Sequence, residues 1–327
     1  MNIHNWVFLM LAGAALFEGG CSVPKITLFP GIADPLREYT LKGDGKEKIL
    51  LITVRGVITD SPVRRVFRNR PSVVQDIVSR LRLAEKDKDV KAVLLKINSP
   101  GGSTTAVDIL YHEIMAFKKR TGAKVVAVMM DVAASGGYYI ALASDYILAH
   151  PTTVTGSIGV MVLRLTLADL MDKIGVDVPV NKSGKNKDMA SPFRRATDEE
   201  EKILQDIIND LGENFLGIVR KHRGIAPQDV TDIATGRIYV AKEAKKIGLL
   251  DEIGYMDDAL SHARELAGLR EGCRVVIYRR AEFPDDNLYH SVDARMHGGR
   301  ISLLELGLAE RAVSLGAGFY YLWPFFE

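Results

Sequence analysis

Through the middle of the chain, continuous apolar runs alternate with segments whose apolar residues recur at helical spacing. Residues 49–54, 92–97 and 124–130 are largely apolar, which is typical of strands buried on both faces of a sheet. Between the first two runs, Val73, Val74, Ile77, Val78 and Leu81 recur at the spacing of a core-facing helix. This alternation predicts strand–helix units.

The same alternation continues towards the end of the chain. Helices are predicted over about 104–119 and 138–143, and strands over 146–149 and 274–278. A longer helix is expected from about Thr197 to Arg223, because Thr197 and Glu200 have the spacing of a capping box. Repeated units of this kind predict an α/β fold, with a mostly parallel sheet and helices packed outside it.

The first 24 residues have the pattern of a targeting segment. Residues 6–17 are an uninterrupted apolar run, the length of a signal-peptide core and too short to span a bilayer unaided. The residues around Cys21 resemble the end of a lipoprotein box, although Glu18 stands where leucine is usual and Lys and Arg are absent before the run. A signal or lipoprotein segment acylated at Cys21, an uncleaved membrane anchor, and a buried apolar segment remain the alternatives.

Three further parts follow this segment. Residues 25–47 are punctuated by proline and glycine, which favours a linker. Residues 48–280 form the predicted catalytic domain. Residues 281–327 form a tail with an apolar stretch, 312–326, which we expect to dock on the body, a neighbouring copy or a lipid surface.

Composition narrows the classes of function. The chain has 327 residues, 47% of them hydrophobic and 26% charged, which is sufficient for a substantial core. A net charge of +2 with interspersed signs argues against nucleic acid as a partner. Cys21 and Cys273 provide neither a disulfide framework nor a metal cluster, so we expect no cofactor.

The candidate nucleophile is Ser135, in the sequence Asp131-Val-Ala-Ala-Ser-Gly-Gly137. This sequence joins a predicted strand to a small-residue helix. A serine in such a turn should expose its hydroxyl, with backbone N–H groups and a helix N-terminus directed at the bond that it attacks.

A serine nucleophile needs a base. His150 is the histidine nearest in sequence, and it also fits a partly buried position at a strand end. The alternative is a desolvated lysine, whose pKa must fall by roughly three units from about 10.4. The loop 182–189 carries Lys182, Lys185 and Lys187, and physical reasoning from the sequence does not separate them.

Four motifs together resemble one family. They are Asn98-Ser-Pro-Gly-Gly102, Ala134-Ser-Gly-Gly-Tyr-Tyr139, Thr155-Gly-Ser-Ile-Gly-Val160, and Lys182-Ser-Gly184 with Lys187-Asp188. Their order and spacing over residues 49–254 resemble the bacterial signal peptide peptidase A family, the short form of the S49 serine peptidases. The resemblance implies a ClpP/crotonase-like fold of repeated ββα units, with helices packed around two stacked sheets, in protomers that assemble into rings.

The resemblance also implies roles for particular residues. Ser135 would be the nucleophile and Lys187 the general base, with Ser157 hydrogen-bonded to the lysine amine. Backbone N–H groups of Gly101, Gly102 and Gly136 would stabilise the oxyanion. In short-form members the serine and the lysine of one site come from adjacent protomers.

The function implied is a membrane-associated serine endopeptidase that degrades cleaved signal peptides. Its catalytic domain would lie on the extracytoplasmic, periplasmic side of the inner (cytoplasmic) membrane. Two alternatives have other chemistry: a non-catalytic S49-like membrane scaffold, and a crotonase-type acyl-CoA enzyme, which shares the fold but has no use for a Ser/Lys pair.

Overall fold

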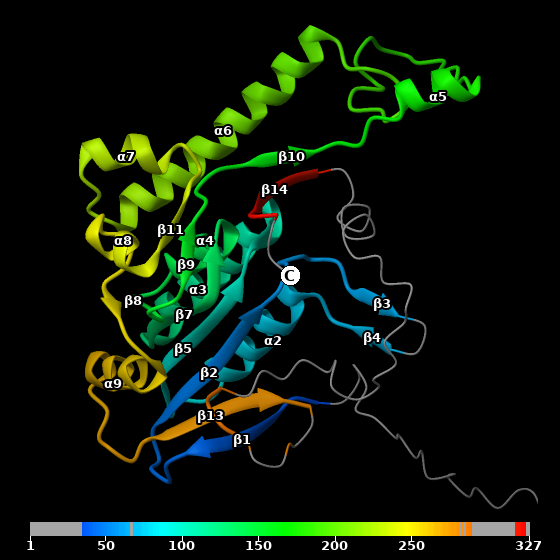
Figure 1. Ribbon diagram of the computed structural model, residues 1–327. Helices are drawn as coiled ribbons and strands as arrows, with labels where there is room; N and C mark the ends of the chain where they lie inside the picture. The colour runs from blue at the N-terminus through cyan, green and yellow to red at the C-terminus, as the bar shows by residue number, and fades with distance from the viewer. Residues whose placement is uncertain (1–34, 66–67, 281–282, 284–285, 290–317, 325–327) are drawn as a thin grey trace, which may run out of the picture.

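The computed structural model describes residues 35–65, 68–280, 283, 286–289 and 318–324 (Figure 1). The predicted N-terminal segment with Cys21 lies outside these residues. The helices are α2 (Val73–Glu85), α3 (Thr104–Thr121), α4 (Gly136–Ala141), α5 (Ala168–Ile174), α6 (Asp198–His222), α7 (Pro227–Ile233), α8 (Ala241–Lys246) and α9 (Met256–Ala267). The strands are β1 (Arg37–Lys42), β2 (Lys48–Arg55), β3 (Val63–Arg65), β4 (Arg68–Arg70), β5 (Val90–Ser99), β6 (Gly101–Ser103), β7 (Lys124–Ala134), β8 (Tyr146–Ala149), β9 (Val154–Gly156), β10 (Met161–Leu163), β11 (Ile238–Val240), β12 (Glu252–Ile253), β13 (Arg274–Arg279) and β14 (Gly318–Leu322).

A nine-stranded sheet forms the centre of the described part of the molecule, in the order β1-β13-β2-β5-β7-β8-β12 (Figure 1). In addition, β9 pairs with β7, and β11 pairs with β9. The strands from β13 to β12 pair in parallel, as the strand–helix alternation predicts. Because parallel strands end at the same edge, the carboxyl ends of β5, β7 and β9 lie together.

Alternate residues of the strands face two separate cores. On β2, Leu50 and Ile52 pack in the larger core with α2, α3, α4 and α6, whereas Ile49 and Leu51 pack in the smaller core with α9. Helices therefore cover both faces of the sheet, which explains the continuous apolar runs in the sequence.

Strand β7 extends further than the sequence predicts. The apolar run ends at Met130, but Val132, Ala133 and Ala134 continue the strand by pairing in parallel with β9. Its first half pairs instead with β8. The extension brings the strand directly to Ser135.

The expected linker is partly a strand. Residues 37–42, within the predicted linker 25–47, form β1 at the edge of the central sheet, antiparallel to β13. The prediction of a linker is wrong there, because the Pro and Gly residues flank a short segment whose backbone groups pair with a strand far away in the sequence.

A second, three-stranded sheet has the order β10-β14-β6. β14 lies within the apolar stretch of the tail and is antiparallel to both neighbours. The tail segment 318–322 therefore packs on the body of its own chain. The pairing joins segments that are far apart in sequence and carry no shared pattern.

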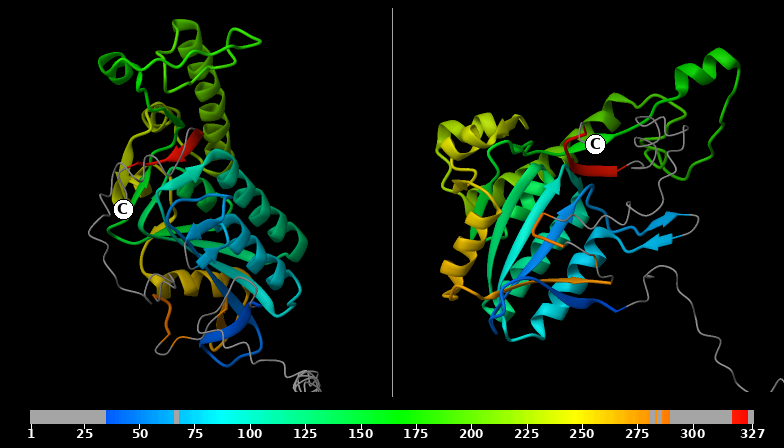
Figure 2. Two further views of the ribbon diagram at one scale, coloured as in Figure 1. Left: turned by 90° about the vertical axis from the view of Figure 1, so that its right-hand side faces the viewer. Right: turned by 60° about the horizontal axis from the view of Figure 1, so that its bottom comes forward.

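Residues 164–197, which we call the arm, extend beyond the N-terminal end of α6 and away from the central sheet (Figure 2). Thr197 and Glu200 form the predicted capping box of α6. Large apolar side chains of the arm are exposed, namely Leu165, Leu170, Ile174, Val176, Val178, Val180 and Phe193. None of the described helices combines the length and the apolar character required to cross a membrane.

Candidate active site

Ser135 occupies a strained turn between β7 and α4. Its backbone has φ 52° and ψ −118°, a conformation that non-glycine residues rarely adopt. The turn is held at both ends, because the Ser135 N–H donates to the Gly156 carbonyl at 2.7 Å and the Ser135 carbonyl accepts from Tyr139 N–H at 2.9 Å. Strain fixed in this way is typical of a presented nucleophile.

The environment of the hydroxyl differs from the expectation. Ser135 is only 1% exposed, so the prediction of an exposed hydroxyl is wrong for this structure. Strand β14 lies against Gly101 and against Gly136, the residue that follows the serine. Within the described part of the chain, Ser135 Oγ has no hydrogen-bond partner. An unsatisfied buried hydroxyl is costly and is consistent with a catalytic role.

Glycines are required where the predicted oxyanion donors lie. A Cβ on Gly101, whose φ is 105°, would lie 2.7 Å from the backbone nitrogen of Gly136. A Cβ on Gly102 would lie 1.9 Å from the carbonyl oxygen of Ile58. Side chains at these positions would overlap backbone atoms. The backbone around Gly101 and Gly102 can therefore approach Gly136 and Ile58 this closely only because both residues are glycine.

The three glycines are not equivalent as donors. The Gly101 N–H donates to Ser99 Oγ at 3.1 Å, and that hydroxyl donates to the Gly56 carbonyl at 2.7 Å. Gly101 therefore already uses its N–H, which argues against its predicted role as an oxyanion donor. Gly102 and Gly136 remain candidates. Ser99 lies within the motif Asn98–Gly102, but the sequence gave no sign that its hydroxyl would bind the Gly101 N–H and the Gly56 carbonyl.

Ser157 lies beside Ser135. Ala134 pairs with Gly156 across β7 and β9, so the two serines are the next residues along neighbouring strands. Ser157 also has φ 52°, and its N–H donates to the Arg237 carbonyl at 2.8 Å. The structure thus brings together the Ser135, Ser157, Gly102 and Gly136 of the prediction.

Lys187 is not part of this group. It is exposed in the arm, in the loop between α5 and α6. Because Ser135 Oγ has no partner among the described residues, neither Lys187 nor His150 is hydrogen-bonded to it. His150 instead contacts Thr152 Oγ1 at 2.8 Å and packs edge-on against Tyr255.

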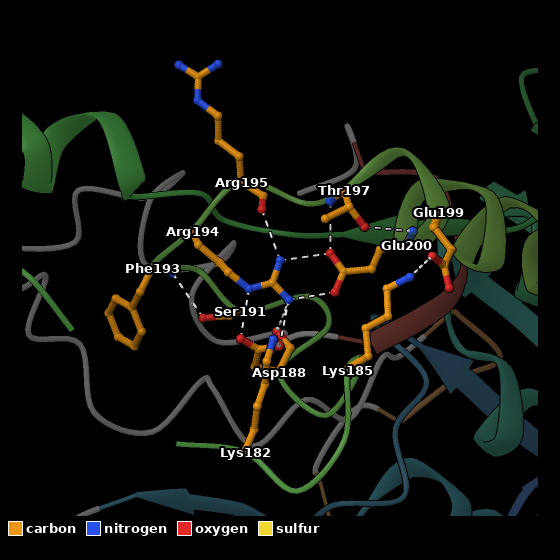
Figure 3. Close-up of polar contacts among 10 residues, drawn as sticks. All are labelled: Lys182, Lys185, Asp188, Ser191, Phe193, Arg194, Arg195, Thr197, Glu199 and Glu200. Carbon is orange, nitrogen blue, oxygen red and sulfur yellow. Dashed lines mark hydrogen bonds and ion pairs between the residues drawn. The ribbon is translucent and has the colours of Figure 1, made fainter. Parts of the chain in front are cut away.

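The three lysines of the loop differ in their contacts, and Figure 3 shows the contacts of Lys182 and Lys185. Lys182 pairs with Asp188 at 2.6 Å, and Lys185 pairs with Glu199. No hydrogen bond or ion pair of the Lys187 side chain occurs within the described residues. The side-chain contacts therefore distinguish Lys187 from Lys182 and Lys185, which physical reasoning from the sequence could not do.

Arg194 connects the lysine loop to α6 (Figure 3). Its guanidinium binds Asp188 at 2.7 Å and Glu200 at 2.6 Å, and Glu200 is almost fully buried. Hydrogen bonds from Arg194, and then from Thr197 N–H, lower the pKa of Glu200 to about 2. Arg194 and then Lys182 hold the pKa of Asp188 well below its usual range. The sequence revealed only the Thr197–Glu200 half of this network.

In the described residues, no cluster of His, Cys, Asp or Glu side chains could hold a metal ion. The arrangement around Ser135 can perform acyl transfer, because a nucleophile lies next to two backbone segments that can stabilise an oxyanion. Among the residues that the structure describes, no base is hydrogen-bonded to Ser135 Oγ.

Comparisons with known proteins agree with this chemistry. A model of peptidase family S49 matches residues 117–270, and a model of the Clp protease family matches residues 56–154. The protein named "Putative signal peptide peptidase SppA" from Enterococcus faecium is 36% identical over 238 residues, which cover 73% of this chain and 69% of that protein.

Two further similarities extend the comparison. "Protease 4" from Haemophilus influenzae is 34% identical over 260 residues, which cover 79% of this chain and 40% of that protein. A solved structure of a ClpP1 mutant from Listeria monocytogenes has 19% identity and a TM-score of 0.42, covering 64% of this chain and 94% of that one. The Clp protease match agrees with the ClpP/crotonase-like α/β fold of the sequence prediction.

Proposed function

This chain belongs to peptidase family S49 and is a serine peptidase, and we propose that it cuts peptides with Ser135 as nucleophile and Lys187 as general base. The observation that supports Ser135 most directly is its strained turn, with an unpartnered Oγ beside the glycines of the site. A strained backbone and a buried hydroxyl without a hydrogen bond both cost free energy of folding. Such features are found most often at functional sites, which supports a catalytic role for Ser135.

The proposed reaction has two steps. The neutral lysine amine takes the Ser135 proton, Oγ bonds to the substrate carbonyl carbon, and the oxyanion is stabilised by Gly102 and Gly136 N–H groups. The C–N bond then breaks, and the leaving amine takes the proton from the lysine. Water hydrolyses the acyl-enzyme by the same route and releases a carboxylic acid.

Lys187 would come from a neighbouring copy. Its exposure in the arm supports this assignment, as do the ion pairs that engage Lys182 with Asp188 and Lys185 with Glu199 of α6. In a single chain the side chain of Lys187 is exposed to solvent. Docking beside Ser135 of another copy would remove it from water, which favours the neutral amine that a base requires.

The arm is suited to such an assembly. Its exposed apolar side chains include Leu170 and Ile174, which are 55% and 62% exposed and lie on one short helix. Apolar side chains gathered on a projecting segment are typical of an interface between copies. We therefore propose a ring in which each arm reaches the Ser135 of the next protomer.

The proposed substrates are signal peptides left in the membrane. The name of the Enterococcus faecium relative supports this substrate class, and the apolar N-terminal run supports a membrane tether. We propose that the catalytic domain lies on the extracytoplasmic side of the cytoplasmic membrane, with Cys21 as a candidate site of lipid attachment.

The first test is covalent labelling. Intact-mass analysis after incubation with a fluorophosphonate should find one adduct on the wild type and none on Ser135→Ala or Lys187→Ala. Lys185→Ala is the matched control, because it removes a lysine from the same loop and should still form the adduct. An assembled wild type without an adduct would favour a scaffold, and CoA binding would favour a crotonase-type enzyme.

A mixing experiment tests the shared site. Ser135→Ala and Lys187→Ala variants, dissociated and reassembled together in equal amounts, should recover about a quarter of wild-type activity, because random neighbours complete that share of the sites. Recovery requires that serine and lysine come from different copies. An inactive mixture that has exchanged subunits contradicts the shared site.

A further inference from the structure

Strand β7 changes partners along its length and bulges where it does so. It pairs with β8 as far as Met129 and with β9 beyond that point. Beside it, β5 advances two residues from Ile97 to Ser99, while β7 advances four residues from Met129 to Ala133. Strand β7 therefore holds two extra residues in a bulge that ends just before Ser135. Bulges next to active sites redirect the side chains that follow them.

Two buried threonines that follow β8 bind the backbone of this bulge. Thr153 Oγ1 lies 2.8 Å from the carbonyl oxygen of Met129 and 2.6 Å from that of Met130. Thr155 Oγ1 donates to the carbonyl of Ala133 at 2.6 Å. Both threonines are 0% exposed. Their hydroxyls therefore bind carbonyls on both sides of the interruption in the strand ladder.

The Thr155 bond joins the two strands that lead to the serines of the site. Ala133 stands two residues before Ser135 in the chain. Thr155 stands two residues before Ser157. The hydroxyl that ties Thr155 to Ala133 thus fixes the spacing of the two strands immediately before both serines. Valine has nearly the shape of threonine, but it would leave the Ala133 carbonyl without this hydrogen bond.

Asn98 binds the bulge from the side of β5. Its Oδ1 accepts from the Val132 N–H at 3.2 Å, and its Nδ2 donates to the Asp131 carboxylate at 2.7 Å. A backbone donor on one side and a carboxylate on the other fix the orientation of the amide. Because β5 leads on to Gly101 and Gly102, Asn98 connects the strand before the glycines to the strand before the nucleophile.

We propose that Asn98, Thr153 and Thr155 are positioning residues of the peptidase. They hold the bulge of β7, and the bulge sets the place of Ser135 relative to the Gly102 N–H. This proposal rests on the proposed function, because it treats Ser135 as the nucleophile. A strained turn persists only where the surrounding structure constrains it, and these hydrogen bonds supply the constraint on the strand before the turn. A displacement of about 1 Å in such a site can cost about 100-fold in rate.

A role in stability alone predicts a different result. Loss of a buried hydrogen bond would then lower the unfolding temperature, but every folded molecule would react at the wild-type rate. The rate of Ser135 acylation, measured on folded and assembled protein, therefore distinguishes positioning from stability.

The first test compares three threonine variants of the full chain. Thr155→Val should slow fluorophosphonate labelling of Ser135 by about 10- to 100-fold, whereas Thr155→Ser, which keeps the hydroxyl, should stay within about threefold of wild type. Thr121→Val is the matched control. Thr121 Oγ1 also donates to a carbonyl, that of Phe117 at 2.8 Å, but it lies at the opposite end of β7 from Ser135.

Intact-mass analysis over time gives the labelling rates, and light scattering with thermal unfolding shows that the proteins compared are assembled and folded. Thr121→Val should unfold at a lower temperature and label at the wild-type rate. Equal labelling rates for Thr155→Val and Thr121→Val would overturn the proposal, as would a Thr155→Ser variant that labels as slowly as Thr155→Val.

The second test exchanges the amide and the carboxylate. Asn98→Asp places a carboxylate against Asp131 and should slow labelling by about tenfold, because like charges push the bulge away from β5. Adding Asp131→Asn restores both hydrogen bonds with the groups exchanged, so the double variant should label within about twofold of wild type. A double variant that labels as slowly as Asn98→Asp would overturn the proposal. Asp131 is exposed, so this pair decides the question even where Thr155→Val fails to fold.

The same measurements separate this proposal from the proposed function. A wild-type protein whose Ser135 forms no adduct would remove the nucleophile, and the positioning residues with it. A wild type that labels at Ser135, beside variants that label equally fast, would overturn the positioning roles and leave the nucleophile in place.

Discussion

The Ser135 turn and the Lys187 loop are built in opposite ways. The turn is buried, strained and fixed by backbone hydrogen bonds to strands of the central sheet. The loop is exposed on the arm and is held by ion pairs between charged side chains. Under the proposed mechanism, folding of one chain completes the serine half of the site, and the lysine half requires docking on a second chain.

The largest effect should come from the arm. The double variant Leu170→Glu with Ile174→Glu places charges on two exposed apolar positions, so folding should be unaffected while assembly fails. Peptidase activity should fall by at least about 1,000-fold if each serine depends on a neighbour's lysine. Light scattering measures the assembly, and Lys173→Ala in the same helix is the control. A fully active monomer would contradict the proposal that each Ser135 depends on the Lys187 of a neighbouring copy.

Gly101→Ala tests the buried half of the proposed site, which is formed by the Ser135 turn and the glycines beside it. A Cβ there would lie 1.9 Å from the Tyr321 carbonyl oxygen and 2.7 Å from the Gly136 nitrogen. Activity should fall by about 100-fold or more, as expected when an oxyanion site is displaced. Gly122→Ala is the matched control. Gly122 also has a positive φ, but a Cβ added there would meet no other atom within 4 Å. Both variants should lose about 1–3 kcal/mol of stability, with Gly101→Ala the less stable. Unchanged activity in Gly101→Ala contradicts the assignment.

Arg194→Met tests whether the ion pairs of Arg194 position the loop that carries Lys187. Loss of its bonds to Asp188 and Glu200 should lower kcat by about tenfold through misplacement of Lys187, with assembly intact. Arg195→Met is the control, since Arg195 is exposed and pairs only with Asp169 among the described residues. It should change kcat less than about twofold. Similar losses in both variants would show that the network does not position the loop.

Acid should loosen the arm before the Ser135 turn. The folded pKa of Glu200 is about 2, lowered from 4.5, and that of Asp188 is also lowered. Groups with lowered pKa values stabilise the fold fully above their ordinary pKa, and this stabilisation is lost as the pH falls from about 4.5 towards 2. Hydrogen exchange in the arm should therefore rise in this window in the wild type. An identical acid response in Arg194→Met would contradict the prediction.

The sequence predicted the parts of the fold that depend on local or periodic patterns. The runs that became β2, β5 and β7 are apolar because both faces of the sheet are covered, and the capping box identified the start of α6. The Ser135 turn was also predictable, because Gly136 and Gly137, placed between an apolar run and a small-residue helix, permit the close backbone approach that a tight strand-to-helix turn requires.

Long-range pairing accounts for most of what was missed. β6 is Gly-Gly-Ser, which carries no hydrophobic period, and β14 reaches it from a distant part of the chain. β1 lies among prolines and glycines that favour a linker. The Arg194 network was missed because Arg, Asp and Glu each resemble solvated surface residues until the fold brings them together.

The wide sequence separation between β14 and its partners has a consequence for folding kinetics. β7 and β9 are joined through β8 by short connections, whereas β14 must close a loop that spans most of the chain before it can pair with β6. Short-range contacts form sooner, since closing a long loop costs more chain entropy. The Ser135 turn should thus form before β14 pairs beside it, and refolding should pass through an interval in which the serine is open to a labelling reagent.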